Sequence, residues 1–239
     1  MELFYLEQVD STNKYAKNNI DKFTDMTVVY TSIQTSGRGR LQRTWNFMGE
    51  ENIYASIILK PTEEYKEIYS NLTQYLCLIL AETFEEYNII PKIKWPNDIL
   101  VNNKKISGIL AESVIVGSKL KGLVLGFGVN LNCNQEKLDL INQPATSLDI
   151  ETGMKIDRDI FLNKILDKFC LRYNEFIEEG FLLIKEDYKK RAGFLDKAIT
   201  VKVFDENFVG IAKDITDSGA LKILDKNNKE HVLLIGDIL

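Results

Sequence analysis

One polar segment of the chain holds three arginines within six residues, interleaved with glycines. It reads Gly37-Arg38-Gly39-Arg40-Leu41-Gln42-Arg43-Thr44-Trp45. Arginine offers a planar fork of N–H donors that matches carboxylate and phosphate oxygens, and glycine lets the backbone come close to a ligand. Without the tryptophan, the segment would suit a solvated basic loop as well as a binding site. The indole of Trp45 favours a site for an anionic ligand that carries a flat ring.

Two further groups of polar and small residues could contribute to the same site. The run Lys94-Trp95-Pro96-Asn97-Asp98 ends a buried-looking strand and precedes Lys105-Ile106-Ser107-Gly108. Ligands often bind at strand ends and in the loops that leave them, although Asn97-Asp98 alone is also a common turn and Lys105 could equally flank an ordinary hairpin. Further along, Gly126-Phe127-Gly128-Val129-Asn130-Leu131-Asn132 places small residues inside a strand, where another backbone or a ligand can come close.

Motifs for several common kinds of catalysis are missing from the sequence. The only histidine is His231, and the three cysteines, Cys77, Cys133 and Cys170, have no CxxC spacing. The sequence contains no GxxxxGK[ST], GxSxG, HExxH or GxGxxG motif. Nucleophilic catalysis by serine or cysteine with histidine, and most zinc sites, are therefore disfavoured. Chemistry that depends on positive charge and on positioning remains.

The composition is that of an ordinary globular protein with an acidic surface. Of the 239 residues, 45% are hydrophobic and 27% are charged, and the formal net charge is −5. Proteins that bind nucleic acid non-specifically are usually basic, so the arginine segment predicts a local site. No run approaches the roughly 20 apolar residues of a membrane span, and residues 1–7 do not resemble a secretory signal. With reduced, mostly buried cysteines, these features predict a cytoplasmic protein with no membrane partner.

Apolar periodicity predicts the elements that must position these residues. Apolar residues at three- and four-residue spacing predict two long helices, at 65–87 and 157–177, and local signals predict shorter ones at 11–20 and 178–191. β-Branched and alternating residues predict strands at 3–9, 27–31, 53–59, 93–95, 99–101, 105–116 and 120–132. Residues 34–46 show no period and are predicted to form a loop.

The pattern changes after about residue 196 to short strands separated by polar turns. Strands are predicted at 199–203, 208–212, 220–224 and 231–234. Such a run is typical of a small barrel-like β module. We therefore predict an α+β protein with two domains, at residues 1–192 and 193–239.

Taken together and in this order, the motifs resemble those of the biotin protein ligase family. The resemblance rests on Ser11-Thr12-Asn13, on Gly37-Arg38-Gly39-Arg40 with Arg43 and Trp45, on Lys94-Trp95-Pro96-Asn97-Asp98, on Lys105-Ile106-Ser107-Gly108-Ile109-Leu110 and on Gly128-Val129-Asn130-Leu131-Asn132. It covers nearly the whole chain, including Gly236-Asp237-Ile238. It implies a catalytic domain with a mixed sheet, like that of class II aminoacyl-tRNA synthetases, and a small SH3-like β-barrel as C-terminal domain.

The same resemblance implies roles for individual residues. Biotin is expected to contact Ser11, Thr12, Asn13, Gln34, Arg38, Gly39, Arg40, Lys105 and Gly108. ATP is expected to contact Arg40, Arg43, Trp45, Lys94, Asn97 and Asn130, with Trp45 near the adenine. Asp98 is the expected ligand of Mg²⁺.

The implied activity is ATP-dependent biotinylation of a lysine through a biotinyl-5′-AMP intermediate. The carboxylate of biotin is already a nucleophile at neutral pH, so its attack on the α-phosphate of ATP needs cations rather than a general base. We expect Arg38 and Arg40 to close over the adenylate and Lys105 to hold the carboxylate. In the second step a carrier lysine attacks the mixed anhydride, and Asp98 is the expected proton acceptor.

The resemblance also implies a partner, the biotin carboxyl carrier protein of a carboxylase, and it is compatible with a monomer or a homodimer. Two features depart from the family pattern. The family often has glycine where Gln42 stands, which predicts a stiffer loop or a different closure. The first strand is expected to begin at residue 3, which leaves no room for the N-terminal helix-turn-helix domain of some members, so no DNA partner is expected.

Two other functions compete with this interpretation. A lipoate or octanoate protein ligase would use the same reaction on a different acid, and competition between the acids for adenylate formation would separate the two. A non-catalytic binding protein or a repressor that binds DNA through the basic loop is the alternative from another class. The acidic net charge argues against the repressor.

Overall fold

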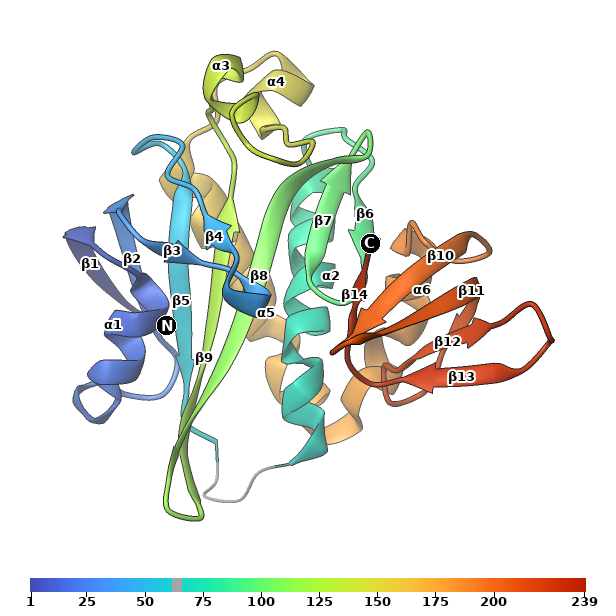
Figure 1. The fold of residues 1–239 in the computed structure, drawn as a ribbon. Coiled ribbons are helices and arrows are strands. Elements are labelled where there is room, and N and C mark those ends of the chain that lie inside the picture. The colour runs from blue at the N-terminus through green and yellow to red at the C-terminus, as the bar shows by residue number, and fades with distance from the viewer. Residues whose placement is uncertain (62–65) are drawn as a thin grey trace.

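Seven strands form one mixed sheet, against which the long helices pack (Figure 1). The computed structural model describes residues 1–61 and 66–239. The strands lie in the order β1-β2-β5-β9-β8-β7-β6. Strands β1 and β2 are parallel, and all the other neighbouring pairs are antiparallel. Their bounds are β1 Glu2–Val9, β2 Thr27–Gln34, β5 Ile53–Leu59, β6 Lys92–Lys94, β7 Asp98–Val101, β8 Lys104–Val116 and β9 Lys119–Val129.

Helices cover both faces of this sheet, because successive residues of its central strands point to opposite sides. Ile57 belongs to the large core under α2 (Leu72–Glu85) and α5 (Arg158–Glu179). Its neighbour Ile58 belongs to a smaller core formed with Ala16 of α1 (Thr12–Asn18). Helix α2 is buried on almost every side, which explains why it is apolar nearly all round. This arrangement leaves one end of β5, β8 and β9 accessible beside α1.

The structure confirms the position of each predicted helix, but the first and last residues of the helices differ from the prediction. The helix predicted at 65–87 begins with a 3₁₀ turn at Glu67–Asn71 and continues as α2, while residue 65 lies outside the described residues. Short 3₁₀ turns are common at helix starts. The helix predicted at 157–177 is α5, and Asp157 caps it by accepting a hydrogen bond from the backbone N–H of Ile160 at 2.9 Å.

The short helices follow the same pattern. Ser11 caps α1, and a 3₁₀ turn at Ile20–Lys22 follows α1. The helix predicted at 178–191 is divided into a 3₁₀ turn, Gly180–Ile184, and α6, Lys185–Arg191. Two short helices were not predicted, α3 (Gln135–Leu138) and α4 (Leu148–Thr152), because each is too short to show a period.

The segment predicted to be a loop at 34–46 was predicted wrongly in part. It contains a two-stranded ribbon, β3 (Gly37–Arg38) and β4 (Thr44–Trp45), joined by a tight turn in which Leu41 and Gln42 have positive φ angles. Strands of two residues carry no alternation that a sequence pattern could reveal. The strand predicted at 120–132 ends at Val129, since the backbone N–H of Leu131 and of Asn132 both bond the side-chain oxygen of Asn52 instead.

A second, five-stranded antiparallel sheet forms the C-terminal part of the chain, as the short strands and polar turns predict. Its order is β13-β12-β11-β10-β14. The bounds are β10 Ala198–Val203, β11 Glu206–Ile215, β12 Leu221–Leu224, β13 Glu230–Leu233 and β14 Asp237–Ile238. The protein is therefore α+β with a terminal β module. No helix in the described ranges is long and apolar enough to cross a membrane.

Hydrogen bonds from the start of α2 and from the end of β6 join the β module to the rest of the protein at one loop. Gln74 Nε2 donates to the carbonyl of Gly219 at 2.9 Å, and Trp95 Nε1 donates to the same oxygen at 3.3 Å. Asn71 Nδ2 donates to the carbonyl of Ser218 at 3.0 Å. These side chains are buried, so the contact is an ordered interface rather than a flexible junction.

Candidate active site

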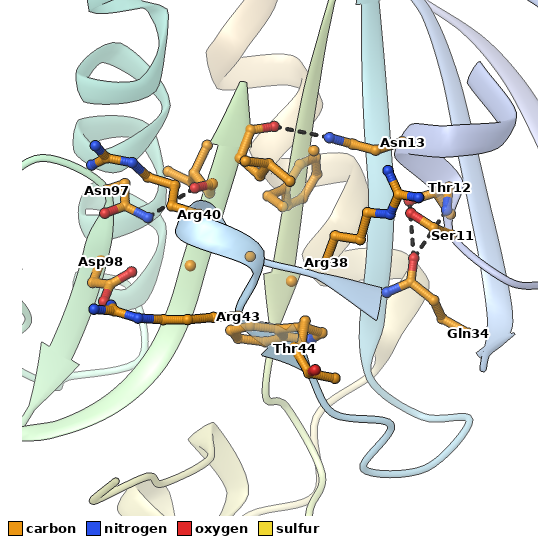
Figure 2. Close-up of a pocket in the computed structure, with 18 of the residues that line it drawn as sticks. Ser11, Thr12, Asn13, Gln34, Arg38, Arg40, Arg43, Thr44, Asn97 and Asp98 are labelled. Carbon is orange, nitrogen blue, oxygen red and sulfur yellow. Dashed lines mark hydrogen bonds between the residues drawn. The ribbon is translucent and has the colours of Figure 1, made fainter. Parts of the chain in front are cut away.

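Segments that are far apart in the sequence meet around one pocket beside α1 (Figure 2). The ribbon β3–β4 crosses above it, and β5, β8 and β9 form its floor. Most of the residues singled out from the sequence line it: Ser11, Thr12, Asn13, Gln34, Arg38, Gly39, Arg40, Arg43, Trp45, Asn97, Asp98, Lys105 and Gly108. Asp237 of β14 also lines it. The structure therefore brings the separate motifs together in a single cavity.

Buried hydrogen-bonding side chains crowd the end of the pocket next to α1. Gln34 Oε1 accepts from the backbone N–H of Thr12 at 3.0 Å, and Ser56 Oγ lies 2.6 Å from Asn13 Oδ1 and 2.8 Å from Thr12 Oγ1. Asn13 Nδ2 donates to the carbonyl of Leu110 at 3.0 Å. Buried polar groups that are paired in this way hold their neighbours in one orientation. This end suits a small ligand group that has both donors and acceptors.

Three glycines in the floor of the pocket, Gly108, Gly126 and Gly128, leave room for the side chains of Asn13 and Trp45. A methyl group on Gly126 would overlap the amide of Asn13, and a methyl group on Gly128 would overlap the indole of Trp45. A methyl group on Gly108 would lie 3.1 Å from Cζ3 of the same indole. The glycines are therefore required by close side-chain approach, as their place inside strands predicts.

The indole of Trp45 packs on Gly128 and Gly108 and lines both the pocket and a smaller neighbouring cavity. The smaller cavity is lined by Thr44, Trp45, Asn46, Met48, Lys105, Asn130, Ile141, Gln143 and Ala145. The indole Nε1 is buried and has no hydrogen-bond partner among the described residues. An aromatic face beside a narrow cavity can stack on a flat ring.

The arginines leave the ribbon in opposite directions (Figure 2). Arg38 points towards Ser11 and Thr12, whereas Arg40 extends towards Asn97. Residues 39–43 form a tight reversal that we call the arginine turn. Its ends are joined by a hydrogen bond from the backbone N–H of Gly39 to the carbonyl of Arg43 at 2.7 Å.

Lys105 and Asp98 form an ion pair in the pocket in which both side chains are largely buried. Lys105 Nζ lies 2.8 Å from Asp98 Oδ1, and their side chains are 16% and 14% exposed. The same ammonium lies 5.6 Å from the centre of the Trp45 ring. The register of β7 and β8 sets Asp98 opposite Gly108, so both members of the pair are held by strands. A cation held in this way can bind an oxyanion without moving far.

The donor set does not fit a resident metal ion. No group of three or more histidine, cysteine, aspartate or glutamate residues gathers within residues 1–61 and 66–239. Asp98 is the expected magnesium ligand, and its carboxylate is engaged by Lys105. Magnesium usually keeps several waters and binds through one or two carboxylates together with substrate phosphates. The pocket is therefore not a preformed metal cage.

Two cysteines near the site are not nucleophiles. Cys77 is fully buried behind Pro96, and burial raises the pKa of its thiol well above the usual value. Burial likewise raises the pKa of Cys133 to about 12. The reactive form of cysteine is the thiolate, so both thiols stay protonated and inert at neutral pH.

Three positions show the limits of the sequence prediction. Lys94, on edge strand β6, lines neither cavity, and Asn130 lines only the smaller one. Asp237 lies in the pocket but was not predicted as a site residue. Its signal was present, because Gly236-Asp237-Ile238 belongs to the family pattern, but nothing in the sequence indicates which part of the chain β14 approaches.

Two protein-family models match the chain. Residues 5–130 match the model of the biotin/lipoate A/B protein ligase family, and residues 194–239 match that of the biotin protein ligase C terminal domain.

Several relatives share most of the chain. The bifunctional ligase/repressor BirA of Bacillus subtilis is 32% identical over 99% of this chain and 73% of its own. A biotin–[acetyl-CoA-carboxylase] ligase of Paracoccus denitrificans is 30% identical over 90% of this chain and 91% of its own. The structure of a biotin protein ligase from Aquifex aeolicus in complex with biotin and ATP superposes with a TM-score of 0.85 and 29% identity, covering 100% of this chain and 97% of that one. The chain belongs to the biotin/lipoate A/B protein ligase family, and its fold is that of the biotin protein ligases.

Proposed function

We propose that the protein activates biotin with ATP and transfers it, through biotinyl-5′-AMP, to a lysine of a biotin carboxyl carrier protein. The observation that carries the proposal is the single pocket in which the buried polar group around Thr12, the arginine ribbon and the Lys105–Asp98 pair converge. The similarity to a biotin protein ligase in complex with biotin and ATP supports the same assignment.

The two ends of the pocket suit the two substrates. The ring system of biotin has donors and acceptors, which match the paired side chains Ser11, Thr12, Asn13 and Gln34. The adenine of ATP would stack on Trp45 at the smaller cavity, next to Asn130. Asn97 lies across the pocket from Thr12 (Figure 2), and Arg43 lines the same pocket, so the phosphates would lie beside these two side chains.

The first step joins two anions, so the site must supply positive charge. The carboxylate oxygen of biotin attacks the α-phosphorus, the bond to the bridging oxygen breaks, and pyrophosphate leaves. Lys105 would hold the carboxylate, while Arg38 and Arg40 would close over the adenylate. Cations in a partly dehydrated pocket stabilise such charge more than they would in water.

The second step transfers the biotinyl group to an amine. The neutral lysine nitrogen attacks the acyl carbon, the acyl–oxygen bond breaks, AMP leaves, and one proton must be accepted. Asp98 would accept this proton, because its carboxylate lies beside the cation that holds the acyl group. Magnesium would enter as the counter-ion of ATP, since the described residues form no metal cage.

The same proposal includes the wider organisation of the protein. Residues 1–192 would form the catalytic domain and residues 193–239 the C-terminal domain. The three cysteines are free thiols, which suits a reducing, cytoplasmic environment. The expected partner is the carrier protein, with no DNA partner, and the protein would act as a monomer or a homodimer.

The test is exchange of labelled pyrophosphate into ATP by the purified protein, with biotin, lipoate or octanoate as the acid. Exchange that depends on biotin alone is the expected result. Exchange that is faster with lipoate or octanoate would reassign the acid substrate, and no exchange with any acid would leave a non-catalytic binding protein as the better description.

A further inference from the structure

Two arginines of the arginine turn converge on one buried carboxylate of the C-terminal β module. Arg40 Nη1 lies 3.1 Å from Asp237 Oδ1, and Arg43 Nη2 lies 3.6 Å from Asp237 Oδ2. The Asp237 side chain is only 7% exposed, whereas those of Arg40 and Arg43 are 26% and 60% exposed. The carboxylate is therefore the buried centre of the group, and the turn is folded onto it.

Asp237 is held rigidly, so it can act as a fixed point for the turn. It lies on β14, opposite Lys202 of β10. The next residues secure the strand, because Ile238 lies opposite Val201 and the backbone N–H of Leu239 donates to the carbonyl of Thr200 at 2.9 Å. A charge on a paired strand keeps its place better than one on a loop.

The turn itself needs support from outside. Leu41 and Gln42 have φ angles of 52° and 60°, in the left-handed region that favours glycine. A residue with a side chain is strained in this conformation relative to an ordinary one. Leu41 as a residue is 65% exposed, so apolar packing does not offset this strain. The ion pairs of Arg40 and Arg43 with Asp237 are contacts that stabilise the turn in this conformation.

We propose that Asp237 is a positioning residue that holds the arginine turn over the pocket and thereby keeps the reaction intermediate bound. The idea rests on the proposed function, because it assigns the C-terminal module a part in retaining the adenylate. Without the carboxylate, Arg40 and Arg43 would repel each other and the strained turn would open. An open turn exposes the mixed anhydride to water and lets it leave.

The central variant is Asp237→Asn, with Asp205→Asn as matched control. Asp205 is an exposed aspartate in the turn between β10 and β11 of the same module, so its replacement removes an equal charge away from the pocket. Asp237→Glu keeps the carboxylate and is expected to restore part of the behaviour. Thermal unfolding shows that each variant is folded before it is compared.

The first readout needs no activity. Hydrogen–deuterium exchange of the substrate-free protein is followed at residues 37–45, where the backbone N–H groups of Gly39 and Arg43 close the turn. Faster exchange there in Asp237→Asn, but not in Asp205→Asn, is expected. Equal exchange in both variants and the parent would overturn the proposal, whatever the substrate of the enzyme.

The second readout is release of labelled biotinyl-5′-AMP from the isolated complex. Asp237→Asn is expected to release it about tenfold faster and to raise the KM for ATP, while kcat for pyrophosphate exchange changes by less than about threefold. A uniform fall in kcat with unchanged release would show a merely structural role and overturn the proposal.

A second variant covers the possibility that Asp237→Asn does not fold. Arg43→Gln removes the more exposed partner of the carboxylate and should speed release in the same direction, by a smaller factor. If both variants fold, their combined effect should be smaller than the product of the two, because they break the same contact. Independent effects would count against the proposal. If the parent forms no adenylate, the proposed function fails, and hydrogen exchange still decides the role of Asp237.

Discussion

Single residues determine where positive charge and flat surfaces lie in the pocket. Lys105 faces Asp98 at 2.8 Å, and Trp45 rests on Gly128 and Gly108. Each contact involves a side chain, so a single substitution can remove it.

Replacing Lys105 by Met should abolish adenylate formation. The ammonium is the buried cation beside Asp98, and loss of one such electrostatic contact costs about 100-fold or more in rate. Biotin-dependent pyrophosphate exchange measures the loss. The neighbouring Lys104 is exposed, so Lys104→Met should retain parental exchange.

Stability has to be separated from chemistry in this variant, because removing Lys105 leaves a buried carboxylate unpaired. The double variant Lys105→Met/Asp98→Asn removes both charges and should recover most of the unfolding free energy. Its exchange activity should remain lost. Recovered activity in the double variant would show that Lys105 only stabilises the fold.

Replacing Gly128 by Ala should weaken ATP binding through Trp45. The added methyl group would overlap the indole and push it off the floor, towards the smaller cavity. We expect the KM for ATP to rise about tenfold, equivalent to about 1.4 kcal/mol. In a Trp45→Ala background the same substitution should have little further effect. An equal effect in both backgrounds would contradict the contact.

At the scale of elements, caps and turns decide where the chain changes direction. The ribbon β3–β4 is too short to be stable alone and is held by the arginine turn and the sheet below it. Helix α5, by contrast, has its own start signal in Asp157.

Replacing Asp157 by Ala should lower the free energy of unfolding by about 1 kcal/mol, because the backbone N–H of Ile160 loses its acceptor at the start of α5. Urea unfolding followed by circular dichroism measures the change. Asp157→Ser keeps an acceptor at the cap and should lose only a few tenths of a kcal/mol. A loss as large as that of the alanine variant would mean that the cap is not the cause.

At the scale of the whole molecule, the terminal β module contacts the rest of the protein at two places. The carbonyl of Gly219 accepts hydrogen bonds from Gln74 and from Trp95, close to Asn97 and Asp98 of the pocket. The same module supplies Asp237 to the arginine turn. The interface therefore reaches the site from two sides.

Replacing Gly219 by Ala should loosen this interface. The added methyl group would overlap the amide of Asn71 and lie 2.6 Å from Gln74 Oε1. Gly153 is the matched control, since it also has a positive φ but nothing lies within 4 Å of the added carbon. Both variants pay roughly 1–2 kcal/mol for the left-handed conformation. Only Gly219→Ala should also make the chain near residue 193 sensitive to limited proteolysis, and equal sensitivity of both would rule out the clash.

Much of this protein was determined by local sequence. Periodicity predicted the long helix α5 and the central strands, because their buried faces repeat at fixed spacing. Polar turns predicted the terminal β module, and the ordered motifs indicated the family and most of the residues that line the pocket. Short elements escaped prediction: β3, β4, α3 and α4 are too short to show a period, and contacts elsewhere stabilise them.

Only the tertiary structure decided which distant residues act together. Asp98 and Lys105 are close in sequence, but their pairing depends on the register between β7 and β8. Asp237 is nearly 200 residues from Arg40 and reaches it because β14 adds to β10 at the edge of the second sheet. A sequence records which side chains carry charge. Which charges neutralise one another depends on distances that packing alone sets, since electrostatic attraction in a buried site falls steeply with separation and exposure.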